Sequence, residues 1–313
     1  MAPVGGVDLG ATNLRAAVAD GAGEPAAIER TATPTGDGTA VARAAAEALE
    51  AAAERAGYSM AGLDAVGVGS IGPLDRAAGT VVRPPNLPGV DRIPLQDVLI
   101  ALLGHPRVYV ENDAVAGLVG ERAAAEGPAA NLVYLTLSTG IGAGIAVDGH
   151  VLRGGRATRP RWATSWSSPG AGAAAAEAPA TGRPTARRRD PRARPRPRRG
   201  RRRQLAAHRE RGAAGPDVFA AVGDDPLADR VVETVQRYNA IGVADLVHAY
   251  APDRIAVGGS VALENPELMI EPLAAAVDEH TMLAVPTIGP AVHGDDAVLR
   301  GALTLAAQGG LER

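Results

Sequence analysis

Two short glycine-containing turns, each between two apolar runs, are the segments of this chain best suited to holding a phosphate group. They are Asp8-Leu9-Gly10-Ala11-Thr12-Asn13 and the turn at residues 138–144. Such turns leave backbone N–H groups accessible to phosphate oxygens. A tight hairpin needs the same residue types for conformational reasons, so each turn alone is equally consistent with a structural role. Their pairing, and a third glycine loop at Gly258-Gly259, favours a polyphosphate ligand such as a nucleotide.

Asp113 is the candidate for acid–base chemistry. It follows the apolar run Val108-Tyr109-Val110 and opens a predicted helix. A carboxylate at the end of a strand can accept the proton of a hydroxyl group while that oxygen attacks a phosphoryl group. Local sequence alone favours a helix N-cap here, since Asn112 and Asp113 both suit that position. The six histidines have no metal-ligand spacing and are interpreted as isolated side chains.

Two copies of one unit are predicted to position these residues. Each copy has a β-hairpin followed by a helix and a further strand, and together they predict an α/β protein with a cleft between its halves. We expect a domain at 1–120 and a second at 121–313, with the C-terminal helix packing back on the first. The predicted segments are hairpins 4–20 and 132–147, strands 64–72, 108–110 and 254–257, and helices 39–56, 111–125, 227–250, 266–279 and 297–307.

Length and composition narrow the class of protein. The chain has 313 residues, 46% of them apolar, which suits about two soluble domains. No apolar run approaches the roughly 20 residues of a membrane span, and the first residues lack a basic region typical of secretion signals. These features favour a cytoplasmic protein. With no cysteine, disulfides, a thiol nucleophile and cysteine-ligated zinc are excluded.

The net charge of −3 conceals an uneven distribution. Residues 156–212 contain 17 arginines and three acidic residues, a charge of +14, which leaves −17 for the rest of the chain. This segment has no Val, Ile, Met or Phe, so we expect it to be disordered or loosely attached. A basic linker and an arm that binds nucleic acid or another anionic surface are two interpretations of such a charge run. Nucleic acid is the less favoured of these.

The ordered segments resemble the ROK family of sugar kinases and related repressors, which has the actin-like ATPase (ribonuclease H-like) fold. The resemblance rests on Asp8–Asn13, Pro85-Asn86-Leu87-Pro88-Gly89, Glu111-Asn112-Asp113-Ala114, residues 137–144 and Val257-Gly258-Gly259-Ser260, in the family's order. It implies that Asp113 is the general base and a sugar ligand, beside Asn86 and Asn112. It also implies ATP contacts at Asp8, Gly10, Thr12, Asn13, Thr139, Gly140, Gly142, Gly258 and Gly259.

By the same resemblance the activity is ATP- and Mg²⁺-dependent phosphorylation of a hexose, with glucose to glucose 6-phosphate the first expectation and a homodimer the expected assembly. Fructose and N-acetylhexosamines are alternative substrates. A transcriptional regulator or a non-catalytic sugar-binding protein is an alternative from another class. Family repressors usually carry an N-terminal helix-turn-helix domain, and the first phosphate turn at Asp8 leaves no room for one in this sequence.

The chain departs from the family after the second hairpin. The family's Glu-x-Gly-His motif and Cys-x-Cys-Gly-x-x-Gly zinc loop are absent, so no residue here is assigned to a metal. If the codons are read one base earlier, the junctions from Pro160/Arg161 to Ala163/Thr164 permit Glu-x-Gly-His, and those from residue 173 to residue 183 permit Cys-Gly-Cys-Gly-x-x-Gly-His-Trp-Glu. We therefore hypothesise that residues 156–212 are a frame-shifted reading of a normal segment. A chain of this kind is expected to have little or no sugar kinase activity.

Overall fold

A computed structural model describes residues 2–125, 129–138, 140–153 and 215–311. The chain forms two compact units, one of residues 1–165 and 239–313 and the other of residues 166–238. In the second unit the described part is α6 (Gly215–Ala220) and the first half of α7 (Pro226–Tyr250). The basic segment at 156–212 lies outside the described residues, and the domain boundary at 120 stays a prediction.

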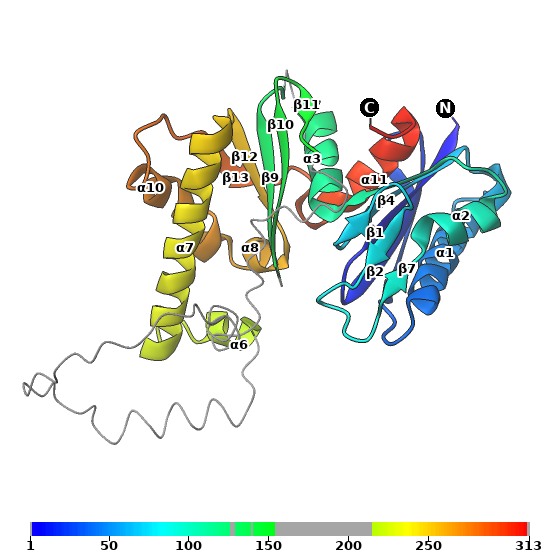
Figure 1. Cartoon of the computed structure of the whole chain (residues 1–313). Helices are drawn as coiled ribbons and strands as arrows, with labels where there is room; N and C mark the ends of the chain where they lie inside the picture. The colour runs from blue at the N-terminus through cyan, green and yellow to red at the C-terminus, as the bar shows by residue number, and fades with distance from the viewer. Residues whose placement is uncertain (1, 126–128, 139, 154–214, 312–313) are drawn as a thin grey trace, which may run out of the picture. The chain divides into compact units, whose positions relative to one another are not determined.

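A five-stranded mixed sheet forms the N-terminal part of the first unit (Figure 1). Its strand order is β3-β2-β1-β4-β8, in which β1 pairs antiparallel with β2 and parallel with β4. Every residue of β4 is buried, as expected for an inner strand covered on both faces. The strands are β1 (Pro3–Leu9), β2 (Asn13–Asp20), β3 (Pro25–Ala32), β4 (Ala65–Ser70) and β8 (Val108–Asn112).

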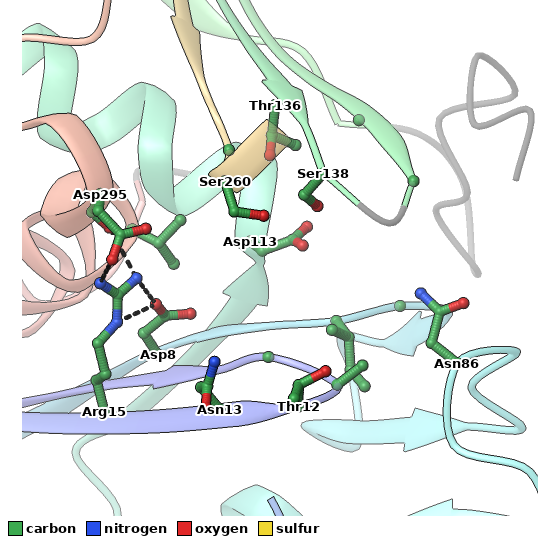
Figure 2. A pocket seen from close by; sticks show the side chains of 18 of the residues that line it. Asp8, Thr12, Asn13, Arg15, Asn86, Asp113, Thr136, Ser138, Ser260 and Asp295 are labelled. Atoms are coloured by element: carbon green, nitrogen blue, oxygen red, sulfur yellow. Dashed lines mark hydrogen bonds and ion pairs between the residues drawn. The ribbon is translucent and has the colours of Figure 1, made fainter. Parts of the chain in front are cut away.

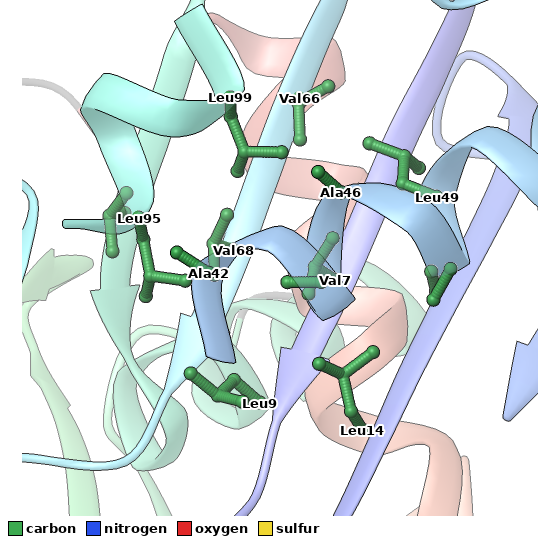
Figure 3. Packing of buried hydrophobic residues seen from close by; sticks show 14 of the residues in the cluster. Val7, Leu9, Leu14, Ala42, Ala46, Leu49, Val66, Val68, Leu95 and Leu99 are labelled. Atoms are coloured by element: carbon green, nitrogen blue, oxygen red, sulfur yellow. The ribbon is translucent and has the colours of Figure 1, made fainter. Parts of the chain in front are cut away.

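Helices α1 (Gly38–Arg55) and α2 (Leu95–Leu103) pack against this sheet (Figure 3). Asp37 caps α1 by accepting a hydrogen bond from the Thr39 N–H at 3.0 Å. The buried face of α1 is rich in alanine, which lets the helix approach the strands closely, and Leu49 fills the space above Gly5 of β1. Burial of this aliphatic cluster, which includes Val7, Leu9 and Leu14, fixes the end of β1 and with it the first turn.

The second sheet repeats the pattern of the first. Its order is β11-β10-β9-β12-β13, and β9 pairs antiparallel with β10 and parallel with β12. The return strand β10 starts at Ile141, four residues before the predicted start, because the turn closes early through a hydrogen bond from Ser138 N to Gly140 O. The strands are β9 (Leu132–Leu137), β10 (Ile141–Val147), β11 (His150–Val151), β12 (Arg254–Gly258) and β13 (Thr287–Pro290).

Two helices link the sheets. Helix α11 (Ala297–Gln308) packs on β1 and β4 through Leu299 and Leu303, and α3 (Asp113–Ala124) packs on β9 and β10. The two helices also pack on each other, with Gly301 of α11 so close to α3 that a Cβ atom there would lie 1.7 Å from the Ala116 carbonyl oxygen. Helix α3, which begins directly after β8, is therefore packed tightly against α11.

Smaller elements complete the first unit. A three-stranded sheet comprises β5 (Leu74–Asp75), β6 (Thr80–Val82) and β7 (Arg92–Ile93). The predicted helix over 266–279 is two helices, α9 (Pro266–Met269) and α10 (Leu273–Asp278), because Pro272 disfavours helical geometry at the residue before it. The short elements η1 (Met60–Gly62), α8 (Ser260–Glu264) and η2 (Gly294–Asp296) join the others. In the described ranges no helix is long and apolar enough to cross a membrane.

Candidate active site

A cavity of about 720 Å³ in the first unit is lined by residues from both sheets and from the segments that follow them (Figure 2). It brings together most of the residues singled out from the sequence: Asp8, Gly10, Thr12, Asn13, Asn86, Asn112, Asp113, Gly140, Gly142 and Gly259. Gly258 does not line it, and Thr139 lies outside the described residues. Residues that are distant in the sequence thus line one cavity, which is compatible with the predicted ligand cleft.

The first glycine turn is held by one hydrogen bond within its own backbone and one from the Thr33 side chain. Gly10 N donates to Asn13 O at 3.0 Å, and the Thr33 hydroxyl donates to Gly10 O at 2.9 Å. A Cβ atom on Gly10 would lie 2.7 Å from Asn13 O, so glycine is required for this closure. The side chains of Thr12 and Asn13 are exposed at the turn, and both line the cavity. The turn can therefore present backbone and side-chain donors to an anion.

The sequence left open whether this position serves as a helix N-cap or as an acid–base residue, and Asn112 and Asp113 differ in this respect. Asn112 is the N-cap of α3, since its Oδ1 accepts from Ala114 N at 3.2 Å while its Nδ2 donates to Ser70 O at 3.3 Å. Asp113 is the first residue of the helix, and its Oδ1 also accepts from Ala114 N, at 2.8 Å. Because Asn112 supplies the cap, the carboxylate of Asp113 remains at the cavity wall.

The environment of Asp113 suits a general base. Burial is the main cause that raises the pKa of Asp113, and the nearby charge of Asp8 adds to it, whereas the hydrogen bond from Ala114 N lowers it; the resulting pKa is about 6. A carboxylate with a pKa near neutrality accepts a proton more readily than an ordinary one and still ionises at pH 7. The position of Asp113 at the cavity wall and its raised pKa are both compatible with the predicted role as proton acceptor.

Asn86 belongs to a loop at the cavity. In the view of Figure 2, Asp113 lies between Asp8 and Asn86. The buried side chain of Leu87 anchors this loop, and Leu87 N donates to Pro84 O at 3.1 Å. Asn86 itself is exposed and lines the cavity. An exposed amide in the same cavity as a carboxylate offers a donor and an acceptor to a hydroxylated ligand.

Several lining residues were missed by the sequence reasoning. Arg15 lies directly opposite Asp8 in the β1–β2 register, a pairing that the hairpin pattern could have revealed. Asp295 reaches the cavity from 280 residues farther along the chain, and no local signal marks it. The hydroxyl-bearing lining residues Thr136, Ser138 and Ser260 also carry no distinctive motif.

Gly258 has a packing role behind the cavity wall. A Cβ atom on Gly258 would lie 2.4 Å from the Tyr134 hydroxyl oxygen, and one on Gly117 would lie 2.2 Å from the Tyr134 ring. The two glycines thus form a slot for the buried Tyr134 ring, which lines the cavity. Burial raises the pKa of the Tyr134 hydroxyl, so it stays a hydrogen-bond donor.

The described donor set fits a magnesium ion that is carried by a ligand's phosphates. Asp8 and Asp113 supply carboxylate oxygens to the cavity wall, and such hard oxygens are what Mg²⁺ prefers, whereas the Asp295 carboxylate is held by Arg15. Within the described ranges no cluster of three or more His, Cys, Asp or Glu forms a ready-made metal cage. One or two carboxylates together with phosphates are the usual arrangement for Mg²⁺ at nucleotide sites.

The cavity brings the two hairpin turns and the buried Asp113 carboxylate together on an α/β scaffold of two similar sheets. The sequence profile of the ROK family matches residues 4–162 and 199–309, and the chain belongs to the ROK family. A glucokinase from Aeropyrum pernix is 33% identical over 98% of this chain and 97% of its own length.

Solved structures agree on the fold. A ROK hexokinase from Thermus thermophilus superposes with a TM-score of 0.69 and 34% identity, covering 96% of this chain and 97% of its own. A ROK family glucokinase from Streptomyces griseus, in complex with glucose and AMPPNP, gives a TM-score of 0.71 and 25% identity, covering 98% and 99%. The chain therefore has the actin-like ATPase fold of ROK sugar kinases, as predicted.

Proposed function

We propose that this chain derives from an ATP-dependent hexose kinase whose substrate is glucose and whose product is glucose 6-phosphate. The observation that carries the proposal is the position of Asp113, with a pKa of about 6, in one cavity with both glycine turns. The relative from Streptomyces griseus that binds glucose and AMPPNP supports a sugar and a nucleotide as the two ligands.

In the proposed reaction the Asp113 carboxylate accepts the proton of the sugar hydroxyl as that oxygen bonds to the γ-phosphorus of ATP. The bond between the γ-phosphorus and the bridging oxygen breaks, and ADP leaves. Mg²⁺, when bound with the nucleotide, neutralises phosphate charge. Asp8 would hold it, and Asn86, Asn112 and Asp113 are the proposed sugar ligands. The turns at Gly10–Asn13 and Gly140–Gly142 are the proposed phosphate contacts.

The same proposal predicts that the chain as written is impaired. Glu-x-Gly-His and the zinc loop, which the family uses on the sugar side, do not occur in the sequence. The proposed nucleotide contacts, such as Asp8 and Gly140, are present and line the cavity. We therefore expect nucleotide binding to be retained and glucose-dependent turnover to be close to background.

A pair of measurements tests the proposal. Calorimetry should detect one Mg·AMPPNP per chain, and a coupled assay should detect little glucose-dependent release of ADP. A chain with the segment 156–212 restored to the alternative frame should phosphorylate glucose, and Asp113→Asn in that chain should lower turnover about 10²–10⁴-fold. Comparing glucose with fructose, mannose and N-acetylmannosamine fixes the substrate. Absence of nucleotide binding, or a restored chain inactive on every sugar, contradicts the proposal.

A further inference from the structure

The guanidinium group of Arg15 is shared by three carboxylates (Figure 2 shows Asp8 and Asp295). Nε and Nη2 both donate to Asp8 Oδ2, at 3.0 and 2.5 Å. Nη1 donates to Asp295 Oδ2 at 2.5 Å and to Asp296 Oδ1 at 3.1 Å, and Nη2 also donates to the Asp295 carbonyl oxygen at 2.7 Å. Every nitrogen of the guanidinium group is therefore engaged.

The contacts with Asp8 are one-sided. Both hydrogen bonds from Arg15 go to Oδ2, and none of the described residues donates to Oδ1. The side chains of Arg15 and Asp8 are 12% and 11% exposed, so water screens this pair little. A planar, rigid guanidinium that holds one carboxylate oxygen by two N–H groups fixes the rotation of that carboxylate. It leaves Oδ1 as the oxygen available to a ligand in the cavity.

The remaining contacts fix Arg15 itself. Asp295 and Asp296 belong to η2, directly before α11, and α11 packs on β1, the strand that carries Asp8. Arg30 also contacts Asp296, at 3.3 Å. Without Arg15, the carboxylates of Asp8 and Asp295 would face each other with no cation between them. Among the described residues, Arg15 of β2 is the cation that contacts both Asp8 and Asp295.

We propose that Arg15 is a positioning residue for Asp8, which turns Asp8 Oδ1 toward the metal-bound phosphates of the nucleotide and is itself held in place by Asp295. This inference rests on the proposed function in one respect, namely that the ligand is a magnesium–polyphosphate. The competing interpretation is an ion pair that only stabilises the fold.

Affinity for AMPPNP with and without Mn²⁺ separates the two interpretations. In the full chain, calorimetry and Mn²⁺ electron paramagnetic resonance are compared for wild type, Arg15→Lys and the control Arg107→Lys. Arg107 forms an exposed pair with Asp64 outside the cavity. Lysine keeps the charge but loses the paired N–H groups. We expect the gain in affinity that Mn²⁺ provides to be about tenfold smaller in Arg15→Lys than in wild type. The affinity for AMPPNP without metal should change less than twofold.

A second variant keeps the test informative if Arg15→Lys does not fold. Asp295→Asn preserves the Arg15–Asp8 contact and removes one anchoring charge, and it should reduce the same metal-dependent gain about threefold. Arg15→Lys introduced into an Asp8→Asn chain should change it no further. Equal losses with and without Mn²⁺, or no loss in either variant, overturn the inference and leave the proposed function intact.

If the wild-type chain binds no AMPPNP, the proposed function fails, and crystal structures of wild type and whichever variant folds decide the inference. A changed Asp8 side-chain rotamer in the variant supports the positioning role. An unchanged rotamer overturns it.

Discussion

Asp8, in β1, and Asp113, at the start of α3, line the same cavity, and the charge of Asp8 contributes to the raised pKa of Asp113. Burial is the larger cause of that rise, so Asp113 is ionised at pH 7 in a place that disfavours its charge. The ionised carboxylate of Asp113 therefore lowers the stability of the fold. Its pKa can be measured through the pH dependence of unfolding, without any substrate.

Asp113→Asn should be more stable than wild type above pH 6. The folded pKa of about 6 exceeds the ordinary value of 3.8, so protonated Asp113 favours the folded state below about pH 4 and this contribution is lost as the pH rises through 6. The advantage of Asp113→Asn in free energy of unfolding should grow by about 1–2 kcal/mol between pH 5 and pH 8. Urea unfolding at pH 5 and pH 8 measures this difference. Asp245→Asn, which changes an exposed aspartate, is the control. A pH-independent difference would contradict the prediction.

Arg15→Ala should lower the free energy of unfolding by roughly 3–5 kcal/mol, because it leaves the buried carboxylate of Asp8 without its cation. Burial already raises the pKa of Asp8 in spite of Arg15. Arg107→Ala removes a pair whose side chains are 57% and 44% exposed and should cost at most about 1 kcal/mol. Chemical denaturation compares the two variants. A double variant Arg15→Ala/Asp8→Asn should recover part of the loss, and equal costs for the two single variants would argue against a buried network.

The extent to which this network is predictable from sequence differs between its residues. Alternating apolar residues around the turn at Gly10 predict a hairpin, and its register alone places Arg15 opposite Asp8. Asp295 meets Arg15 only because α11 packs on β1, a contact between segments nearly 300 residues apart that no local pattern encodes. The position of Asp113 followed from the change from strand to helix, but its pKa depends on burial by the whole cavity.

The missed elements have equally physical causes. Strands β5 and β7 have two residues each, too short for any alternation to show. The break at Pro272 was visible in the sequence, yet the apolar spacing on either side continued the helical pattern. Strand β10 begins at Ile141 since glycines at 142 and 144 pair in the ladder, although glycine is depleted in strands.

Gly301→Ala should destabilise the chain by more than about 3 kcal/mol or prevent folding, because a Cβ atom would lie 1.7 Å from the Ala116 carbonyl oxygen at the crossing of α3 and α11. Gly242 provides a matched control within α7. A Cβ atom there meets nothing within 4 Å, so Gly242→Ala should be neutral or stabilise by up to about 1 kcal/mol through helix propensity. Thermal unfolding followed by circular dichroism ranks the two. Similar melting temperatures would show that the two helices can separate at low cost.

The coding DNA of residues 156–212 should spell the missing ROK motifs when it is read one base earlier. The family profile breaks off after 162 and resumes at 199, and this unmatched stretch lies within the segment of +14 charge. Trp162 has a single codon, so the junction of Trp162 with Ala163 must encode glycine, and the neighbouring junctions then determine Glu-x-Gly-His or exclude it. Sequencing the gene decides this directly. A chain restored to that frame should bind one zinc ion and lose it when its new cysteines are replaced by serine, because zinc loops of this type need thiolate ligands. Junctions that encode neither motif would rule out the frame-shift hypothesis and leave the arginine-rich segment as a genuine feature of the protein.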